Sequence, residues 1–261
     1  MSWCGRLGEA VWNGWRSVAY GAAVMVAAVR LAVCPSTWSA PVRRVLALQI
    51  YFTAIQAIPL ASLLSLIMGV TVVVQGLWLS RLVGDSRLLG ALLVGLFMRE
   101  MAPLVVNFIV IGRSGTAIAA ELAAGSVGGD WKTLEAQGVD PMVYLVTPRV
   151  LGMGISVFCL TVLFVALAFV AGYFVAAVMG LARTPGHFVT QLLVGLSRSD
   201  GWALPARTIV PGMATAAIAC MEGFRTRGQV TEIPQAATRA VVRATTALIL
   251  ILAVLTAIQY G

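Results

Sequence analysis

The chain alternates between long uncharged intervals and short charged ones. Residues 45–80 and 150–182 contain no charged side chain, and none follows Arg243. Two further apolar intervals are interrupted, the first by Arg99-Glu100 and the second by Arg207. A membrane-spanning helix needs about 20 mostly apolar residues. The pattern therefore predicts five spans, near residues 50–80, 88–112, 147–180, 203–222 and 242–260.

The first thirty residues have a different, amphipathic pattern. A polar stripe recurs at helical spacing opposite an apolar one that carries Trp3 and Trp15. This pattern is typical of a helix lying at the membrane interface, with tryptophan rings at headgroup depth. Charged residues recur through it, so we do not expect a signal peptide. The alternative is a sixth span at 17–29, which has only 13 uncharged residues. The polar stripe consists of Arg6, Glu9, Asn13, Arg16 and Tyr20.

Composition supports an all-α integral membrane protein. Hydrophobic residues make up 60% of the chain and charged residues 11%, whereas soluble domains carry roughly 25% charged residues. A soluble domain, a disordered chain, a disulfide scaffold and a coiled coil are therefore excluded. We expect two regions, an N-terminal interfacial helix and connector over 1–44 and a membrane domain over 45–261. The four cysteines have no paired spacing and are expected to be buried thiols.

The distribution of basic residues predicts the orientation. The net charge is +8, and the segments alternating between the two sides carry 12 and 5 basic residues. The side with more Lys and Arg is expected to be cytoplasmic. The N-terminus is then cytoplasmic and the C-terminus periplasmic. Excess arginine in such a protein indicates contact with anionic headgroups rather than with nucleic acid.

Arg99-Glu100 is the most unusual feature within a predicted span. A charge at the bilayer centre costs roughly 3 kcal/mol or more. One hypothesis is that the pair lines a polar cavity or binds a lipid headgroup. The alternative is that both residues pair with charges on neighbouring helices and hold the bundle together.

The run of small residues that begins at Gly112-Arg113-Ser114-Gly115 also has two interpretations. Small residues allow close helix packing. The Gly-x-Ser-Gly spacing also resembles the nucleophile motif of rhomboid intramembrane proteases. A serine nucleophile needs a nearby base, and the single histidine, His187, is predicted to lie in a polar loop.

A short helix is predicted between the second and third spans. Asp130 is expected to cap it, residues 131–137 to form it, and Gly138 to end it. Two helical turns are not stable alone in water. A partner surface that covers Trp131 and Leu134 is therefore expected, or else a linker helix that lies on the membrane.

The sequence contains no catalytic or metal-binding constellation that we recognise. Lys132-Thr133 follows Trp131 where a phosphate-binding loop requires glycine. A single histidine excludes an H-E-x-x-H site. We therefore expect no nucleotide, metal or other cofactor bound by this chain.

Motifs in order from about residue 45 to the end resemble the MlaE/YrbE-type permease family. The motifs are Arg99-Glu100-Met101-Ala102-Pro103, Gly112-Arg113-Ser114-Gly115-Thr116-Ala117, Ala120-Glu121-Leu122, Gly138-Val139-Asp140-Pro141, Pro148-Arg149-Val150-Leu151, Gly223-Phe224-Arg225 and Ala237-Thr238-Arg239-Ala240-Val241-Val242.

The resemblance implies the permease subunit of an ABC transporter that moves phospholipids between the inner and outer membranes of a bacterium. In that family a permease homodimer binds two cytoplasmic ATPase subunits, which carry ATP and Mg, and a periplasmic MCE-domain protein. The stretch about 130–138 would be the coupling helix. One departure is Gly128-Gly129-Asp130, where the family commonly has Thr-Glu-Gln at the start of that helix.

The resemblance also suggests which residues act. Arg99 and Glu100 match the family's charged pair near the lipid cavity, and the apolar Met68, Leu77 and Trp78 are assigned to acyl-chain contact. The expected ATPase-coupling residues are Glu121, Asp130, Trp131, Leu134 and Asp140. Alternatives are an intramembrane serine protease with Ser114 as nucleophile and a membrane transporter without ATP coupling.

Overall fold

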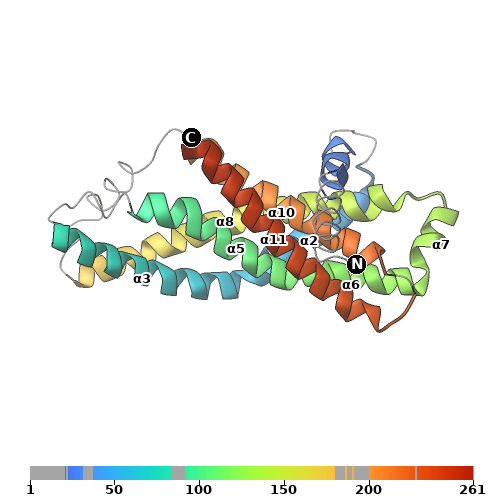
Figure 1. Cartoon of the computed structure of the whole chain (residues 1–261), viewed down its shortest axis with the longest axis horizontal. Helices are drawn as coiled ribbons and strands as arrows, with labels where there is room; N and C mark the ends of the chain where they lie inside the picture. Colours follow the sequence, from blue (N-terminus) through green and yellow to red (C-terminus); the bar gives the residue numbers. More distant parts are fainter. Residues whose placement is uncertain are drawn as a thin grey trace, which may run out of the picture.

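The computed structural model describes residues 21, 23–31, 38–83, 92–179, 186, 190, 200–226 and 228–260. Within these residues every regular element is a helix, which confirms the all-α class. The predicted interfacial stripe and His187 lie outside the described residues. The bundle is elongated, and its helices run roughly along the long axis (Figure 1).

Among the residues that the structure describes, five helical stretches are long and apolar enough to cross a membrane, which agrees with the predicted number. The first contains α2 (Ala40–Thr53), a 3₁₀ turn η2 (Ile55–Ala57) and α3 (Ile58–Val83). The second contains η3 (Leu92–Met101), α5 (Ala102–Val110), η4 (Ile111–Gly115) and α6 (Thr116–Gly128). The third contains η5 (Met142–Val146) and α8 (Thr147–Val178). The last two are α10 (Asp200–Phe224) and α11 (Glu232–Tyr260), and the short α7 (Asp130–Ala136) joins the second stretch to the third.

The predicted starts of the first and fifth spans, near 50 and 242, are wrong by about three turns. α2 begins at Ala40, with proline in its first turn, and α11 begins at Glu232. Proline is tolerated in a first turn because the amide it lacks has no helical partner there. The uncharged interval marks the part of a helix that hydrocarbon covers, whereas the helix continues into the headgroup region, where arginine is tolerated.

The second span is also longer than predicted. The expected end near 112 is wrong, because the helix continues through Arg113 to Gly128. Arg113 donates a hydrogen bond to the Gln56 Oε1 of the first span over 2.6 Å. Arg99 and Glu100 consequently lie in the first turns of this helix, within η3, and not at its middle.

Two of the wide π-helical segments lie directly before prolines. η3 ends one residue before Ala102-Pro103, and η5 ends before Thr147-Pro148. Proline removes a backbone donor, and its ring clashes with the carbonyl one turn earlier. A wider turn relieves this clash while the helix continues.

Close packing between spans depends on small residues. A Cβ placed on Gly69 would lie 2.4 Å from the backbone oxygen of Ala168, and one on Gly172 would lie 2.4 Å from a methyl group of Val73. These contacts bring α3 and α8 together at the distance that only glycine allows. Small residues in a span are therefore explained by packing at this crossing.

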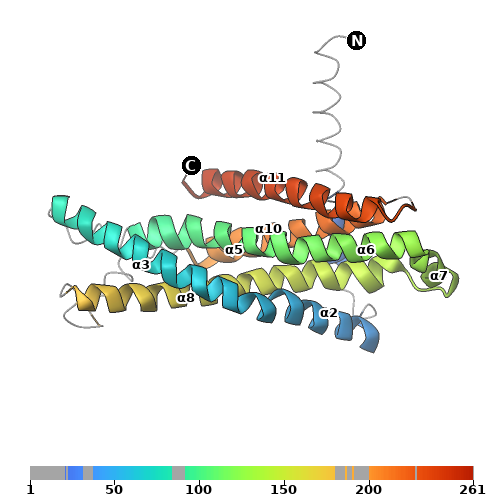
Figure 2. The ribbon, with the colours of Figure 1, turned by 90° about the horizontal axis from the view of Figure 1, so that it is seen from below.

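Figure 2 shows how the helices are layered. α11 lies along one side, α6 and α10 lie beneath it, and α2, α3 and α8 form the opposite side. α10 contacts α6, α8 and α11, which makes it the central helix. The end of the molecule that carries α7 also carries the turn between α10 and α11 (Figure 1).

Candidate functional site

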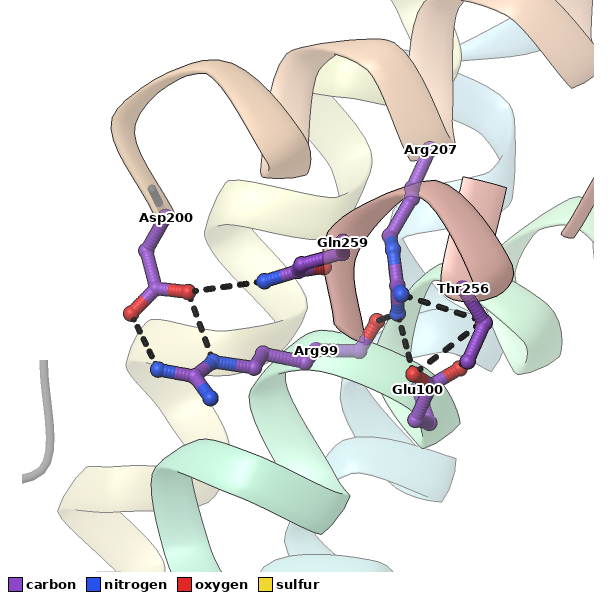
Figure 3. Close-up of polar contacts among 6 residues, drawn as sticks. All are labelled: Arg99, Glu100, Asp200, Arg207, Thr256 and Gln259. Atoms are coloured by element: carbon purple, nitrogen blue, oxygen red, sulfur yellow. Dashed lines mark hydrogen bonds and ion pairs between the residues drawn. The ribbon is translucent and has the colours of Figure 1, made fainter. Parts of the chain in front are cut away.

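Arg99 and Glu100 belong to a cluster of charges that joins three spans (Figure 3). We call it the Arg99–Glu100 cluster, and it contains η3, α10 and α11 side chains. Arg99 forms a two-point contact with Asp200, with Nε 2.6 Å from Oδ1 and Nη2 donating to Oδ2 over 2.8 Å. Asp200 is the first residue of α10 and is buried. The amide of Gln259 on α11 donates to the same carboxylate over 3.5 Å.

The second pair in the cluster is Glu100 with Arg207. Arg207 Nη1 lies 2.5 Å from Glu100 Oε1 and also donates to the backbone oxygen of Arg99 over 2.7 Å. Arg207 Nη2 donates to Thr256 Oγ1 over 3.0 Å, and that hydroxyl is 3.3 Å from both Glu100 oxygens. The Arg207 side chain is 1% exposed, whereas that of Glu100 is 31% exposed. Glu100 is therefore the partner of this pair that an approaching molecule could contact.

The cluster contains two guanidinium groups and two carboxylates, so it is neutral. Burying an unpaired charge is costly, and mutual pairing removes most of that cost. This pairing agrees with the second interpretation of Arg99-Glu100, in which both residues pair with charges on a neighbouring helix and hold the bundle together. Arg207 was noticeable in the sequence because it interrupts an apolar interval. Asp200, Thr256 and Gln259 were not, because their proximity to Arg99 and Glu100 depends on how the helices pack.

The apolar residues predicted to contact acyl chains lie on α3. Met68 is half-buried and packs against the core of the bundle. Trp78 is 66% exposed, which on a membrane helix means that lipid or another chain covers it. The side chain of Leu77 lies outside the described residues.

Trp131 fixes α7 against the ends of two spans. Its indole Nε1 donates to Ser126 Oγ over 2.9 Å, and the Leu122 backbone oxygen lies 3.2 Å away. Its ring meets Phe224 at the end of α10 edge to face, with centroids 5.6 Å apart. It also covers Gly125, where a Cβ would lie 2.2 Å from a ring carbon.

The boundaries of α7 follow from two glycines. Gly129 has φ 78° and Gly138 has φ 76°, both in the left-handed region where glycine is favoured. Gly138 therefore ends the helix as predicted. The prediction that Asp130 caps it is wrong, because Gly129 is the capping residue and Asp130, the first helical residue, makes no side-chain capping bond. An acidic residue in a first turn still favours the helix dipole.

The remaining predicted coupling residues lie around α7. Leu134, on α7, is half-buried and packs against the hydrophobic core of the bundle. Glu121 is exposed and holds the buried Arg149 on α8, with Arg149 Nη2 donating over 2.7 Å. Asp140 caps the next segment, because its Oδ1 accepts from the Met142 amide over 2.8 Å.

A pocket of about 280 Å³ lies beside α7. Its wall combines the Trp131 and Phe224 rings with aliphatic side chains of η5, and Glu135 and Asp140 also line it. Both acids are exposed. An apolar pocket with a carboxylate rim suits an aliphatic side chain that ends in a positive charge.

A second cluster of charges surrounds Glu222 near the end of α10. We call it the Glu222 cluster, and it contains Glu222, Arg225, Arg239 and Arg243. The carboxylate is 1% exposed. Arg239 Nε donates to its Oε2 over 3.2 Å, and Arg243 Nη1 donates to Oε1. Arg225 Nη1 lies 3.8 Å from Oε1. Glu222 was not among the residues predicted from the sequence, because its partners Arg239 and Arg243 lie 17 and 21 residues away on the next helix.

The serine of the Gly-x-Ser-Gly motif lies inside the bundle. Ser114 is in η4 and is 6% exposed, and its motif neighbour Gly115 would bring a Cβ within 3.5 Å of Thr215 on α10. The contact at Gly115 is an ordinary one and a Cβ on Gly112 would meet no atom within 4 Å, so close packing does not require these two glycines. Among the described residues no three His, Cys, Asp or Glu side chains gather where they could hold a metal ion.

Comparison with known proteins connects these features. A family model described as "Permease MlaE" matches residues 46–258. The chain is 32% identical over 164 residues to the chloroplast protein Trigalactosyldiacylglycerol 1 of Arabidopsis thaliana, covering 61% of this chain and 45% of that protein. It is 29% identical over 159 residues to a probable ABC transporter permease protein of Synechocystis, covering 61% and 60%.

A third relative aligns over a greater length. The chain is 27% identical over 217 residues to the intermembrane phospholipid transport system permease protein MlaE of Haemophilus influenzae, covering 82% of both chains. The alignments with the chloroplast and cyanobacterial proteins cover less than two thirds of those relatives. The family match includes all five spans and α7.

Proposed function

The chain belongs to the MlaE permease family, and we propose that it is the membrane subunit of an ABC transporter that moves phospholipids between the inner and outer membranes. ATP hydrolysis in a partner subunit supplies the energy. The observation that carries this proposal is the family match over 46–258, which includes the five spans and the short helix at one end. The relative from Haemophilus influenzae is named for phospholipid transport.

The α7 end is the proposed ATPase contact. Trp131 holds α7 rigidly against Ser126 and Phe224, so a force applied to α7 reaches the ends of α6 and α10. The outward face of α7 and the acid-rimmed pocket beside it would contact the ATPase. ATP and Mg would be bound by that partner, whereas this chain supplies the mechanical connection.

The Arg99–Glu100 cluster is the proposed polar end of the lipid path. Glu100 keeps a partly exposed carboxylate, and the pair with Arg207 holds it in place. We assign lipid contact to Arg99 and Glu100, with Met68, Leu77 and Trp78 along the acyl chains. The exposed Trp78 supports the presence of lipid or protein against α3.

The proposed assembly contains two copies of this chain, two ATPase subunits and a periplasmic MCE-domain protein in the bacterial inner membrane. The α7 end faces the cytoplasm, and the C-terminus of α11 faces the periplasm. Only 17% of the most apolar 18-residue stretch of α11 is buried within one chain. The outer position of this helix therefore supports a second copy of the chain, or lipid, packed against it.

Affinity purification of this chain with its chromosomal neighbours, followed by native mass spectrometry, tests the proposal. We expect two copies of this chain, two ATPase subunits and retained phospholipid. A chain that purifies without an ATPase, and whose lipid content does not respond to ATP, would contradict it. Labelling of Ser114 by a serine-reactive probe would instead support the protease alternative, which no observation in the described residues favours.

A further inference from the structure

We propose that the Glu222 cluster binds the phosphate of an anionic phospholipid at the membrane face that carries α7. This site is separate from the Arg99–Glu100 cluster. Thr256 of α11 belongs to the Arg99–Glu100 cluster and Arg243 of the same helix to the Glu222 cluster. Thr256 follows Arg243 by 13 positions, which corresponds to about 20 Å along the helix.

The charges of the Glu222 cluster do not balance. One carboxylate meets three guanidinium groups, and in the described part of the chain no other acid pairs with any of the three. The cluster therefore has two positive charges in excess. The Arg99–Glu100 cluster, built from the same residue types, is neutral. Such an excess of positive charge beside a membrane attracts an anion from outside the chain.

The exposure of the arginines is suited to such a ligand. Glu222 is buried beneath them, whereas the side chains of Arg225, Arg239 and Arg243 are 62%, 38% and 36% exposed. A guanidinium has five N–H donors, and the hydrogen bonds to Glu222 use one donor each from Arg239 and Arg243. The outward N–H groups thus remain available, and a phosphate is the anion whose oxygens match the planar fork of arginine.

The depth of the cluster specifies a lipid. No charged residue follows Arg243 on α11, which continues to Tyr260. These 17 uncharged residues span about 25 Å, close to the ~30 Å of the hydrocarbon core. Arg243 consequently lies at headgroup depth, with Arg239 one turn further out. A lipid phosphate is located at this depth, so the arginines need not leave the membrane boundary to reach it.

The test compares two double variants of the full chain in nanodiscs of equimolar phosphatidylglycerol and phosphatidylcholine. R225Q/R239Q makes the cluster neutral and keeps the Arg243–Glu222 contact. R43Q/R44Q removes the same charge from two exposed arginines of α2 that form no ion pair in the described part of the chain. After transfer to mild detergent, native mass spectrometry measures the ratio of retained phosphatidylglycerol to phosphatidylcholine.

We expect R225Q/R239Q to lower this ratio about fivefold for each arginine removed, and R43Q/R44Q, whose arginines belong to no such cluster, to lower it by a smaller factor. E222Q should raise the ratio, because it adds one positive charge to the cluster; a purely structural role for Glu222 predicts no rise. An unchanged ratio in a folded R225Q/R239Q variant would overturn the proposal. Displacement of phosphatidylglycerol by millimolar inorganic phosphate would also overturn it and identify a soluble anion as the ligand.

Loss of ATPase copurification in R225Q/R239Q with an unchanged lipid ratio would assign this surface to the ATPase and overturn the lipid site. The proposal requires the membrane spans but not the ATPase contact. Failure of ATPase copurification in the unmodified chain therefore contradicts the proposed function and leaves the lipid ratio as an independent result.

Discussion

At the scale of single residues, two adjacent opposite charges are satisfied by one neighbouring helix. Asp200 and Arg207 are seven residues apart on α10, so both face the same side, two turns from each other. Arg99 and Glu100 point in different directions, Arg99 toward Asp200 and Glu100 toward Arg207 and Thr256. The ion pairs explain why these charges are tolerated. Their contact with lipid stays a prediction, supported by the partial exposure of Glu100.

Replacing Arg207 with methionine should destabilise the bundle because Glu100 loses its buried partner. Breaking such a pair costs about 3 kcal/mol, which corresponds to a fall in the melting temperature of about 6–12 °C for a chain of this size. Thermal unfolding of the purified protein in detergent measures it. The double variant E100Q/R207M should recover part of the loss, because no unpaired charge remains.

Asp130→Asn is the matched control for that experiment. Asp130 is exposed and forms no ion pair in the described part of the chain, so its neutralisation should cost only the helix-dipole contribution of about 0.3–1 kcal/mol and shift the melting temperature much less than R207M does. Equal destabilisation of R207M and E100Q/R207M would show that the pair contributes packing and not charge compensation. Phospholipid retained by E100Q at the level of the unmodified protein would argue against Glu100 as a lipid contact.

At the scale of helices, the hydrophobic pattern predicts how many spans exist but not where they end. The uncharged intervals follow from the requirements of hydrocarbon, and these gave five spans correctly. The ends of the helices were predicted wrongly because Arg113 is hydrogen-bonded to Gln56 and Arg243 is paired with Glu222, so each helix continues past a charged residue. Such partners belong to other helices, so the local sequence does not contain them. α7 was predicted closely, since Gly138 and Pro141 act within the segment itself.

Gly125→Ala should displace α7 without altering its outward surface. The added Cβ would lie 2.2 Å from the Trp131 ring, and overpacking of this kind costs about 1–3 kcal/mol. The movement should lower ATPase copurification about fivefold or more. Gly128→Ala is the control in the same helix, because its Cβ would meet Asp130 at an ordinary 3.4 Å. Equal ATPase recovery from both variants would show that the position of α7 does not control binding.

Trp131→Ala together with Leu134→Ala should weaken ATPase binding by a different route. Both side chains pack against the core, so truncation releases α7, and it also removes the Trp131 wall of the pocket beside it. Loss of two such contacts costs several kcal/mol locally, and copurification should fall with little change in the melting temperature of the spans. Unchanged copurification would place the ATPase contact elsewhere.

At the scale of the whole molecule, the two charged clusters lie about 20 Å apart along α11. Thr256 of this helix belongs to the first cluster, and Arg243 belongs to the second. The neutral Arg99–Glu100 cluster holds three spans together at one end, and the positive Glu222 cluster lies near α7 at the other. The sequence indicated Arg99 and Glu100 as unusual because they interrupt an apolar interval. It did not indicate their partners, because Asp200 and Thr256 resemble ordinary residues near helix ends. A candidate site of this kind requires the packing of the helices.

The orientation of the bundle is the last prediction, and it follows from the same asymmetry. The α7 end is expected to face the cytoplasm, because the segments assigned to that side from the sequence carry 12 basic residues against 5 on the other side. Two single-cysteine variants report on the two ends. Lys132→Cys places a thiol on the exposed side of α7, and Gly201→Cys places one at the exposed start of α10, where a Cβ meets no atom within 4 Å. With native cysteines replaced, a membrane-impermeant maleimide applied to spheroplasts should label Gly201→Cys at once and Lys132→Cys only after lysis. The reverse order would place α7 in the periplasm, where no ATPase could bind it, and both the orientation and the proposed coupling would then be wrong.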